Sequence, residues 1–525
     1  MRFFNTAGPC AEAWHYMLPA ADRLPDVPRL VERGMYFGVH APHQTGKSTT
    51  MKALARQLTE RGQLAALRIS CETASVAGDD HVLGQRDILQ TIRDTARSAL
   101  PAELWPPAEW PAADDTHLLS AGLRAWVHAC PRPVVLFLDE FDALQGKTLR
   151  SVLLQLRAEA GHRPEHALWS LGLCGLRDVH DVHVAGSAHG ALDSFVPFNI
   201  QGESLRLGDF SESEVAALYA QHTAETGQPF TDEALARAFA LTRGQPWLVN
   251  ALAHEITHEM RIEPPTPITA EHVDQARERL IRQRPTHLDW LLAQLRDDRV
   301  RRVIEPLLTG VLTAGLRHGD AEYVHDLGLV ARGPTLHIAN PIYGDAIVRY
   351  LGAVVENGVA LPPGHFVGAD GRLELPAVLR AFAALWQEHG AEIAPAVIYA
   401  DAAPQIALVT YLHRILNGTG FVDCEYGIER GHIQVQLRWP YQDQQGQRQW
   451  HREVIEIRVW RPRAPDPLDE GLQQLDESLA RLGLDHGVLM IADRHAARSS
   501  DEPARPMTFK QARTPKGRVV TVLRV

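Results

Sequence analysis

Residues Met35–Thr50 read MYFGVHAPHQTGKSTT, in the order apolar strand, polar loop and helix start. Tyr36–Val39 predict a short buried strand, and Ala41–Ser48 have the spacing A-x-x-x-x-G-K-S. A loop of this kind wraps phosphate groups with its backbone N–H groups, and the following helix directs its positive end at them. The stretch therefore predicts an α/β fold with a phosphate-binding loop.

Each polar residue of this loop has an expected role. Lys47 is placed to reach the β- and γ-phosphates of a nucleoside triphosphate, and Ser48 to bind Mg²⁺. Ala41 stands where the pattern usually has glycine, at a position that tolerates a small residue. The loop residues predicted to bind the nucleotide are Ala41, Pro42, His43, Gln44, Thr45, Gly46, Lys47, Ser48 and Thr49.

A second segment, Pro133–Leu144, reads PVVLFLDEFDAL and is an apolar strand that ends in two carboxylates. Asp139 at the strand tip is expected to hold the Mg²⁺ shell, and Glu140 to polarise an attacking water. A buried strand with a solvated acidic end is the alternative. The phosphate loop upstream favours the catalytic interpretation, which includes hydrolysis as well as binding.

Three further segments extend the pattern. Trp169–Asp178 predicts a third strand, with Arg177 at its end placed to sense a γ-phosphate. Ser211 has Glu214 at capping-box spacing, which predicts a helix start. Pro246 opens another helix inside the segment LTRGQPWLVNALAHEI.

Together, the loop, the L-D-E strand end, the strand-end arginine and the G-Q-P helix start resemble the STAND class of AAA-like P-loop ATPases. These are related to origin-recognition-type ATPases, and the resemblance covers about residues 1–350. It implies that Pro246 lies against the adenine of ATP and that Arg177 reads the γ-phosphate. It also implies a nucleotide-operated switch rather than a fast metabolic ATPase. The residues do not identify an arginine finger.

Composition limits the remaining possibilities. The chain has 525 residues, enough for about three domains, and its formal net charge of -11 requires any DNA contact to come from local basic patches. Its five cysteines form no C-x-x-C pair, which favours neither a zinc cage nor a disulfide framework. Without a signal-peptide pattern or an apolar run near ~20 residues, we expect a cytoplasmic protein that does not enter a membrane.

Two histidine-rich segments are weaker signals. His254–His258, HEITH, matches the zinc-protease pattern H-E-x-x-H on a helix. No third histidine follows at the usual short spacing, so we favour an amphipathic helix that exposes these side chains. The second segment, Asp178–Gly190, is glycine-rich and is read as a solvated loop.

From Leu288 the pattern is three helices, a short β hairpin and a last helix, which resembles a winged helix. One interpretation is DNA binding through Arg299, Arg301 and Arg302. The other is an intramolecular latch on the nucleotide site. Acidic residues on the presumed recognition helix oppose phosphate contact and favour the latch. Those acidic residues are Asp320, Glu322 and Asp326.

The last part of the chain, about Leu373–His495, has the order helix, strand, strand, helix, strand. The two central strands are GHIQVQLRWPY and QRQWHREVIEIRVWR, and Glu456 and Arg458 project from one face of the second. This order, with a charged pair in the middle of the sheet, resembles the restriction-endonuclease-like PD-(D/E)xK fold.

That chemistry needs an aspartate on the first strand and E-x-K on the next, so that two carboxylates hold Mg²⁺ and the lysine orients water. Glu456 occupies the second carboxylate position, Arg458 the lysine position, and Gln434 falls where the aspartate is expected. A neutral amide removes an anionic ligand, and a planar guanidinium poorly suits a compact water-orienting role. Asp423 and Glu425 would substitute only in a shifted register. We therefore predict a nuclease-like fold whose metal site is degenerate.

The sequence as a whole predicts an ATP- and Mg²⁺-dependent switch that hydrolyses ATP slowly and controls an inactive nuclease-like module. The alternatives are an ATP-gated DNA nuclease and a scaffold that binds ATP without hydrolysing it. The basic C-terminal region has two interpretations, a docking surface for a DNA or protein partner and simple solvation of its charges, and both stay open. The predicted parts are a P-loop ATPase core at 1–203, a helical lid at 204–284, a winged helix at 285–352, a linker at 353–370 and a nuclease-like domain at 371–525.

Overall fold

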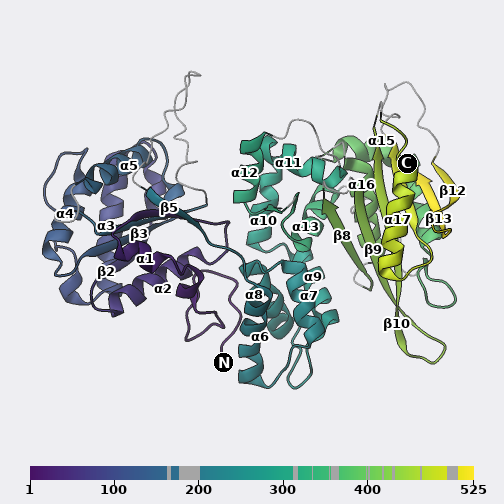
Figure 1. The fold of residues 1–525 in the computed structure, drawn as a ribbon, viewed down its shortest axis with the longest axis horizontal. Helices are drawn as coiled ribbons and strands as arrows, with labels where there is room; N and C mark the ends of the chain where they lie inside the picture. The colour runs from purple at the N-terminus through teal and green to yellow at the C-terminus, as the bar shows by residue number, and fades with distance from the viewer. Residues whose placement is uncertain are drawn as a thin grey trace. The chain divides into compact units, whose positions relative to one another are not determined.

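The computed structural model contains two compact units. The first unit is Met1–Pro229 with Gly244–His254, and the second is Phe230–Arg243 with Glu255–Val525. Figure 1 labels most of the helices and strands of both. The structure describes residues 1–161, 167–176, 201–310, 317–333, 335–353, 355, 366–397, 399, 402–416, 419–427, 432–461, 464–493 and 507–525.

The first unit is built on a five-stranded sheet in which every neighbouring pair is parallel. Its strand order is β2-β3-β4-β1-β5, so β4 lies between the strand of the phosphate loop and the strand of the two carboxylates. This sheet confirms the predicted P-loop α/β core. The strands are β1 (Tyr36–His40), β2 (Ala65–Ser70), β3 (Val134–Asp139), β4 (Ser170–Gly175) and β5 (Gln201–Arg206).

Helices cover both faces of this sheet, which explains why its strands are apolar throughout. Alternate residues of β3 enter separate cores. Leu136 and Leu138 pack with α3, α4 and α5, while Val135 and Phe137 pack with α1 and α2. The helices of the first unit are α1 (Val27–Glu32), α2 (Lys47–Glu60), α3 (His81–Ala99), α4 (Leu118–Ala129), α5 (Gly146–Ala160), α6 (Glu212–Thr226) and α8 (Pro246–His254).

The second unit contains a mixed eight-stranded sheet of order β12-β13-β11-β10-β9-β8-β7-β6. One face of its centre packs on α17 through a cluster that includes Val454, Leu475 and Leu479. The strands are β6 (Val330–Arg332), β7 (Leu336–Ile338), β8 (Phe421–Gly427), β9 (His432–Gln442), β10 (Arg448–Trp460), β11 (Val488–Asp493), β12 (Thr508–Arg513) and β13 (Val519–Arg524).

The helices of the second unit follow the predicted order. Between Thr286 and Leu351, three helices precede the hairpin β6–β7 and one follows it, which is the element order expected from the sequence, and the winged helix stays a prediction. The helices of the second unit are α7 (Asp232–Thr242), α9 (Ala270–Gln283), α10 (Thr286–Ala293), α11 (Asp298–Thr309), α12 (His318–Asp326), α13 (Pro341–Leu351), α15 (Leu375–Ala396), α16 (Ala403–Leu416) and α17 (Leu468–Leu482).

The hairpin β6–β7 is part of the C-terminal sheet. His337 on β7 pairs antiparallel with Gly427 on β8, so strands from either side of the predicted linker at 353–370 share one sheet. The predicted domain boundaries therefore stay predictions, because the segments predicted as winged helix and nuclease-like domain contribute strands to the same sheet. Part of the predicted linker lies outside the described residues.

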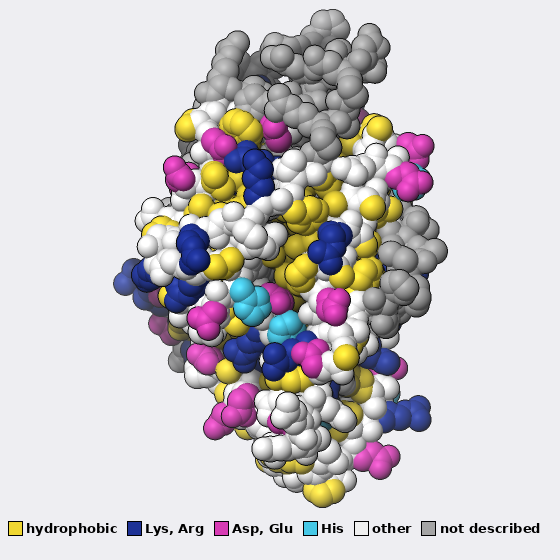
Figure 2. All heavy atoms as spheres, turned by 90° about the vertical axis from the view of Figure 1, so that its right-hand side faces the viewer, with side chains coloured by type: hydrophobic (Ala, Val, Ile, Leu, Met, Phe, Trp, Pro, Cys, Tyr) yellow, Lys and Arg dark blue, Asp and Glu magenta, His cyan; other side chains and the backbone are white. Residues whose placement is uncertain are grey.

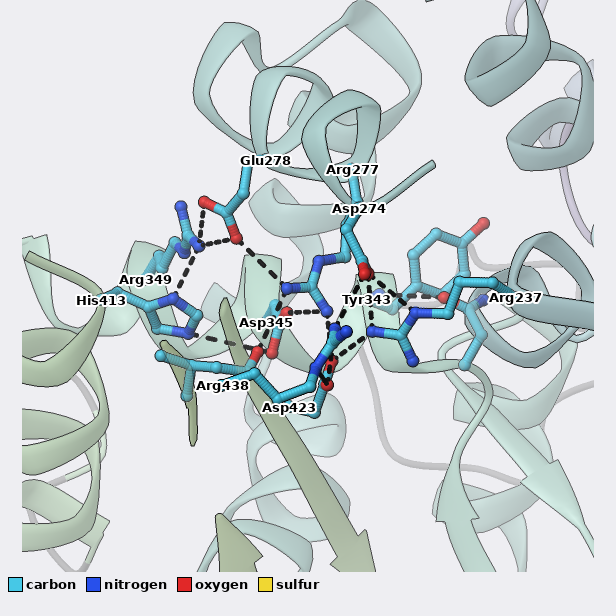
Figure 3. A network of polar contacts seen from close by, with 12 residues as sticks. Arg237, Asp274, Arg277, Glu278, Tyr343, Asp345, Arg349, His413, Asp423 and Arg438 are labelled. Atoms are coloured by element: carbon cyan, nitrogen blue, oxygen red, sulfur yellow. Dashed lines mark hydrogen bonds and ion pairs between the residues drawn. The ribbon is translucent and has the colours of Figure 1, made fainter. Parts of the chain in front are cut away.

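A buried network of ion pairs connects helices and strands of the second unit (Figure 3). Its centre is Asp423 on β8, whose Oδ1 accepts hydrogen bonds from Arg277 on α9 and Arg237 on α7, at 2.5 and 2.6 Å. Arg438 on β9 contacts both Asp423, at 3.1 Å, and Asp274 on α9, at 2.8 Å. Arg277 is fully buried, so its charge depends on these carboxylates.

The same network extends to α13 and α16. Arg349 on α13 donates to both carboxylate oxygens of Glu278 at 2.7 Å and lies 2.7 Å from Nδ1 of His413 on α16. Burial would raise the pKa of Glu278, but Arg349 and Arg277 lower it to about 2. The network therefore connects α7, α9, α13 and α16 to the sheet through charged side chains.

Candidate functional site

The loop that follows β1 is held in a shape that suits phosphate binding. Gly46, at the N-cap of α2, has φ of 90°, and an added Cβ would lie 2.9 Å from Nη1 of Arg23. Thr45 is buried, and its hydroxyl donates to the carbonyl of Pro42 at 2.8 Å. The first N–H groups of α2 begin directly after this turn, which is the arrangement that binds phosphate at a helix N-terminus.

Lys47 lies in the curve of the loop. Its Nζ donates to the carbonyls of Ala41 and Pro42, at 2.6 and 2.9 Å. Burial lowers the pKa of Lys47, and the nearby Asp142 and Asp139 oppose this effect. An ammonium so placed is available to exchange backbone partners for phosphate oxygens.

The two predicted carboxylates lie at the C-terminal end of β3, held by residues of β2. Asp139 is fully buried and forms an ion pair with Arg68, whose Nε lies 3.0 Å from Oδ2. The hydroxyl of Ser70 donates to Glu140 Oε2. The parallel register places Ser70 directly beside Asp139. Arg68 and Ser70 were not predicted from sequence, where the only signal was a pair of polar residues at the end of an apolar strand.

These oxygen atoms are of the kind that Mg²⁺ prefers. A hydroxyl from the phosphate loop and a carboxylate from β3 are hard ligands, and Mg²⁺ typically takes few protein ligands beside water and phosphate. Ser48 and Asp139 therefore fit the role of holding the ion. Asp139 would have to release Arg68 or share its oxygens between the two cations.

A pocket opens beside the phosphate loop, within the first unit. Its space, including its opening to solvent, is about 610 Å³. Pro246, predicted to face the adenine, lines this pocket together with loop residues Gln44, Gly46 and Thr49. Its other lining residues are Asn5, Thr6, Ala7, Gly8, Cys10, Tyr16, Met17, Leu18, Ala20, Arg23, Thr50, Phe210, Leu218, Trp247 and Asn250.

The N-terminal segment was missed by the sequence reasoning, although it forms much of this pocket. The backbone N–H of Cys10 donates to the Thr49 hydroxyl at 3.0 Å, and Trp247 donates to the Thr6 carbonyl at 2.9 Å. Arg23 donates to the Thr45 carbonyl at 2.7 Å, and burial lowers the pKa of Arg23 to about 10. No local motif marks these residues, because their role depends on the folded path of the chain.

The G-Q-P segment begins α8 as predicted and contacts the phosphate loop. Gln245 donates through Nε2 to the Gln44 carbonyl at 3.3 Å. Gly244 has φ of 80°, and a Cβ there would lie 1.8 Å from the Phe210 carbonyl oxygen, so only glycine fits. The other predicted nucleotide residue, Arg177, lies outside the described residues.

The predicted degenerate nuclease site has the expected strand register. Gln434 on β9 is the direct antiparallel partner of Glu456 on β10. Gln434 donates to the Ser478 hydroxyl and accepts from Arg481 at 2.7 Å, so its amide is held by α17. Arg458 is paired with Glu470 at 3.3 Å. Arg458 and Gln434 stand at the positions where the predicted PD-(D/E)xK pattern requires a lysine and an aspartate, and the nuclease-like domain stays a prediction.

The residues offered as substitutes for the missing aspartate do not fill that position. Asp423 is engaged by the arginines of the buried network, and Glu425 pairs in register with Gln434 from β8. The predicted DNA-binding arginines of the winged-helix segment are also paired. Arg302 lies 2.7 Å from Asp320, Arg299 lies 2.8 Å from Asp297, and Arg301 lies 3.2 Å from Glu305.

The expected basic character of the C-terminal region is partly neutralised. Arg448 pairs with Glu271 at 2.6 Å, and Arg518 pairs with Asp476 at 2.8 Å. On the face shown in Figure 2, lysine and arginine side chains alternate with acidic ones rather than forming one continuous basic patch.

The HEITH segment is divided between two elements. His254 ends α8, and Glu255–Glu259 form a π-helical turn. The Glu255 carboxylate, which would be the base in a zinc protease, forms an ion pair with Arg279.

Within the described part of the chain, no helix is both long and apolar enough to cross a membrane.

Comparison with known proteins bears on the first unit. Residues 33–182 match the family model described as an AAA domain. This match confirms the prediction of an AAA-like P-loop ATPase core, and such a core binds nucleotide, usually with Mg²⁺. The STAND class, the winged helix and the nuclease-like domain stay predictions. A search of curated proteins gave no match.

Several solved structures are similar to the chain at low sequence identity. The Walker-type ATPase PabY2304 of Pyrococcus abyssi is 11% identical with a TM-score of 0.46, over 66% of this chain and 99% of its own. RuvB of Thermotoga maritima, a Holliday junction branch migration motor, is 15% identical with a TM-score of 0.33, over 60% and 88%. The FIGL-1 AAA domain in complex with ADP is 17% identical with a TM-score of 0.30, over 53% and 84%.

Proposed function

We propose that the chain is an ATP-dependent switch that hydrolyses ATP slowly and thereby controls the second unit. One observation carries this proposal: the phosphate loop, the Asp139–Glu140 strand end and the pocket lined by Pro246 belong to one compact unit. Lys47 would bind the phosphates, Ser48 and Asp139 would hold Mg²⁺, and Glu140 would orient water. Arg177 keeps its proposed role as a γ-phosphate sensor.

Chain connectivity suggests how nucleotide state reaches the second unit. Gly244–His254 belongs to the first unit, whereas the segments on either side of it belong to the second. Gln245 contacts the phosphate loop and Pro246 lines the pocket. A ligand that moves the start of α8 therefore acts on two of the three chain connections between the units, those on either side of Gly244–His254. A ligand with different affinities for two positions of α8 shifts their populations.

The switch is tested by comparing ATP and ADP states of the full chain. We compare the Glu140→Gln variant saturated with ATP and the same variant saturated with ADP. We expect the small-angle scattering profiles to differ, or the total tryptophan fluorescence, to which Trp247 in the pocket contributes. Lys47→Ala is the matched control, since it should show one profile under both conditions. Identical profiles for both nucleotides, with binding verified separately, would refute the switch while leaving ATPase activity intact.

We also propose that the nuclease-like module is inactive, because Gln434 and Arg458 are committed to other side chains. The expected result is no cleavage of linear, circular or single-stranded DNA with Mg²⁺ or Mn²⁺, with or without ATP. Calorimetry should show no tight Mg²⁺ binding that depends on Glu456. Cleavage that disappears in Glu456→Ala would instead establish the ATP-gated nuclease.

A further inference from the structure

Three side chains outside both sites described above converge at one end of β10. His451 and Glu453 lie two residues apart on that strand and so project from the same face. The parallel pairing of Ile455 with Val488 on β11, continued back by two residues, places His486 beside Glu453. Ligand atoms of all three lie within 4.8 Å of one another. We propose that His451, Glu453 and His486 bind a divalent transition-metal ion, for which Zn²⁺ is the probe.

The distances in the cluster match the spacing of ligands around a metal ion, and Nε2 of His486 and Oε1 of Glu453 are also within hydrogen-bond distance. Glu453 Oε1 lies 3.4 Å from Nε2 of His451 and 3.2 Å from Nε2 of His486. Two ligands about 2.0–2.1 Å from a tetrahedral Zn²⁺ are about 3.3 Å apart, whereas N–H···O hydrogen bonds are commonly about 2.9–3.0 Å. Oε1 of Glu453 therefore lies about as far from each imidazole nitrogen as two ligands of one Zn²⁺ ion lie from each other.

The three side chains differ in burial, and one of them faces solvent. The Glu453 side chain is 8% exposed and that of His451 is 15% exposed, while His486 is 60% exposed. A buried carboxylate, a half-buried imidazole and a solvent-facing imidazole offer three protein ligands and room for water, as in His₂Glu zinc sites.

This site is separate from the predicted nuclease site. Glu453 and Glu456 are three residues apart on β10 and so face opposite sides of the sheet. Gly487 follows His486, and a Cβ there would lie 3.1 Å from Cγ1 of Val454, which fixes the turn close to the strand. A bound ion would join β10 to the turn that leads into β11, and so would stabilise the C-terminal sheet.

The test is Zn²⁺ titration of the full chain, stripped with chelator and without nucleotide, followed by calorimetry at neutral pH. We expect one site tighter than the background of surface histidines. Glu453→Gln and His486→Ala should each weaken it at least about tenfold, since even outer-shell changes cost that much. X-ray absorption at the zinc edge should show two imidazole ligands.

The matched control is His389→Ala, since His389 is 46% exposed and lies 3.7 Å from both Glu388 and Glu392. That variant should keep the tight site. The exposed His486 provides a variant that preserves the fold if Glu453→Gln does not. Absence of a tight site in the wild type, or equal binding by wild type and His486→Ala, would overturn the proposal.

Discussion

Glu140→Gln is expected to reduce ATP turnover about 10²–10³-fold while leaving ATP affinity within a few-fold of the wild type. Positioned general bases contribute about 10²–10⁴-fold, and the isosteric amide cannot accept a proton. The loss corresponds to about 3–4 kcal/mol of activation free energy. Steady-state phosphate release and equilibrium binding of a fluorescent ATP analogue measure the two quantities separately.

Two other substitutions make this result interpretable. Glu103→Gln makes the same chemical change at an exposed position in the first unit and should leave turnover unaltered. Ser70→Ala removes the hydroxyl that donates to Glu140 and should lower turnover by less than Glu140→Gln, because the base is loosened but kept. Unchanged turnover in Glu140→Gln would favour the ATP-binding scaffold over the hydrolysing switch.

The hydrolytic site divides clearly into what sequence predicts and what it does not. The phosphate loop and the L-D-E strand end are local patterns, so Lys47 and Asp139 are visible in a few consecutive letters. Arg68 and Ser70 become site residues only through the pairing of β2 with β3, about 70 positions along the chain. No periodicity in the stretch AALRIS reveals which strand will lie beside it.

The second unit shows the same division at the scale of the fold. Strands β12 and β13 were not predicted, whereas the order β9, β10, α17, β11 and the register of Gln434 with Glu456 follow from alternation of polar and apolar residues. The addition of the hairpin β6–β7 to the C-terminal sheet does not, because edge pairing of β7 with β8 leaves no sequence pattern. Asp423 illustrates the consequence: it was weighed as a metal ligand, yet arginines from two helices bind it.

Asp423→Ala is expected to destabilise the second unit by about 3–5 kcal/mol, because it removes a carboxylate partner of the fully buried Arg277. Arg277 is fully buried and Arg237 is 22% exposed, and both donate to this one aspartate. Chemical denaturation resolved into separate transitions for the two units is the measurement, since a chain of two units need not unfold in one step. Asp423→Asn should fall between wild type and Asp423→Ala, since it keeps hydrogen bonding without charge.

The control is a solvent-exposed pair in the same unit. Arg448 and Glu271 have side chains 55% and 28% exposed, so Arg448→Ala should cost less than about 1 kcal/mol. An equal loss in Arg448→Ala and Asp423→Ala would contradict the burial argument. Unchanged stability in Asp423→Ala would mean that the arginines find other partners or reach water.

The network also predicts how stability depends on pH. Burial would raise the pKa of Asp423, but its three arginines hold it below the usual value, and Glu278 is lowered to about 2. Their stabilisation is present above the unfolded pKa values near ~4 and is lost as pH falls toward the folded values. Burial raises the pKa of Asp345 to about 7, which acts oppositely, but only between about pH 4 and 7. We therefore expect the second unit to lose stability steeply below about pH 4, and Asp423→Asn to flatten that slope. A slope unchanged in Asp423→Asn would assign the acid sensitivity to other carboxylates.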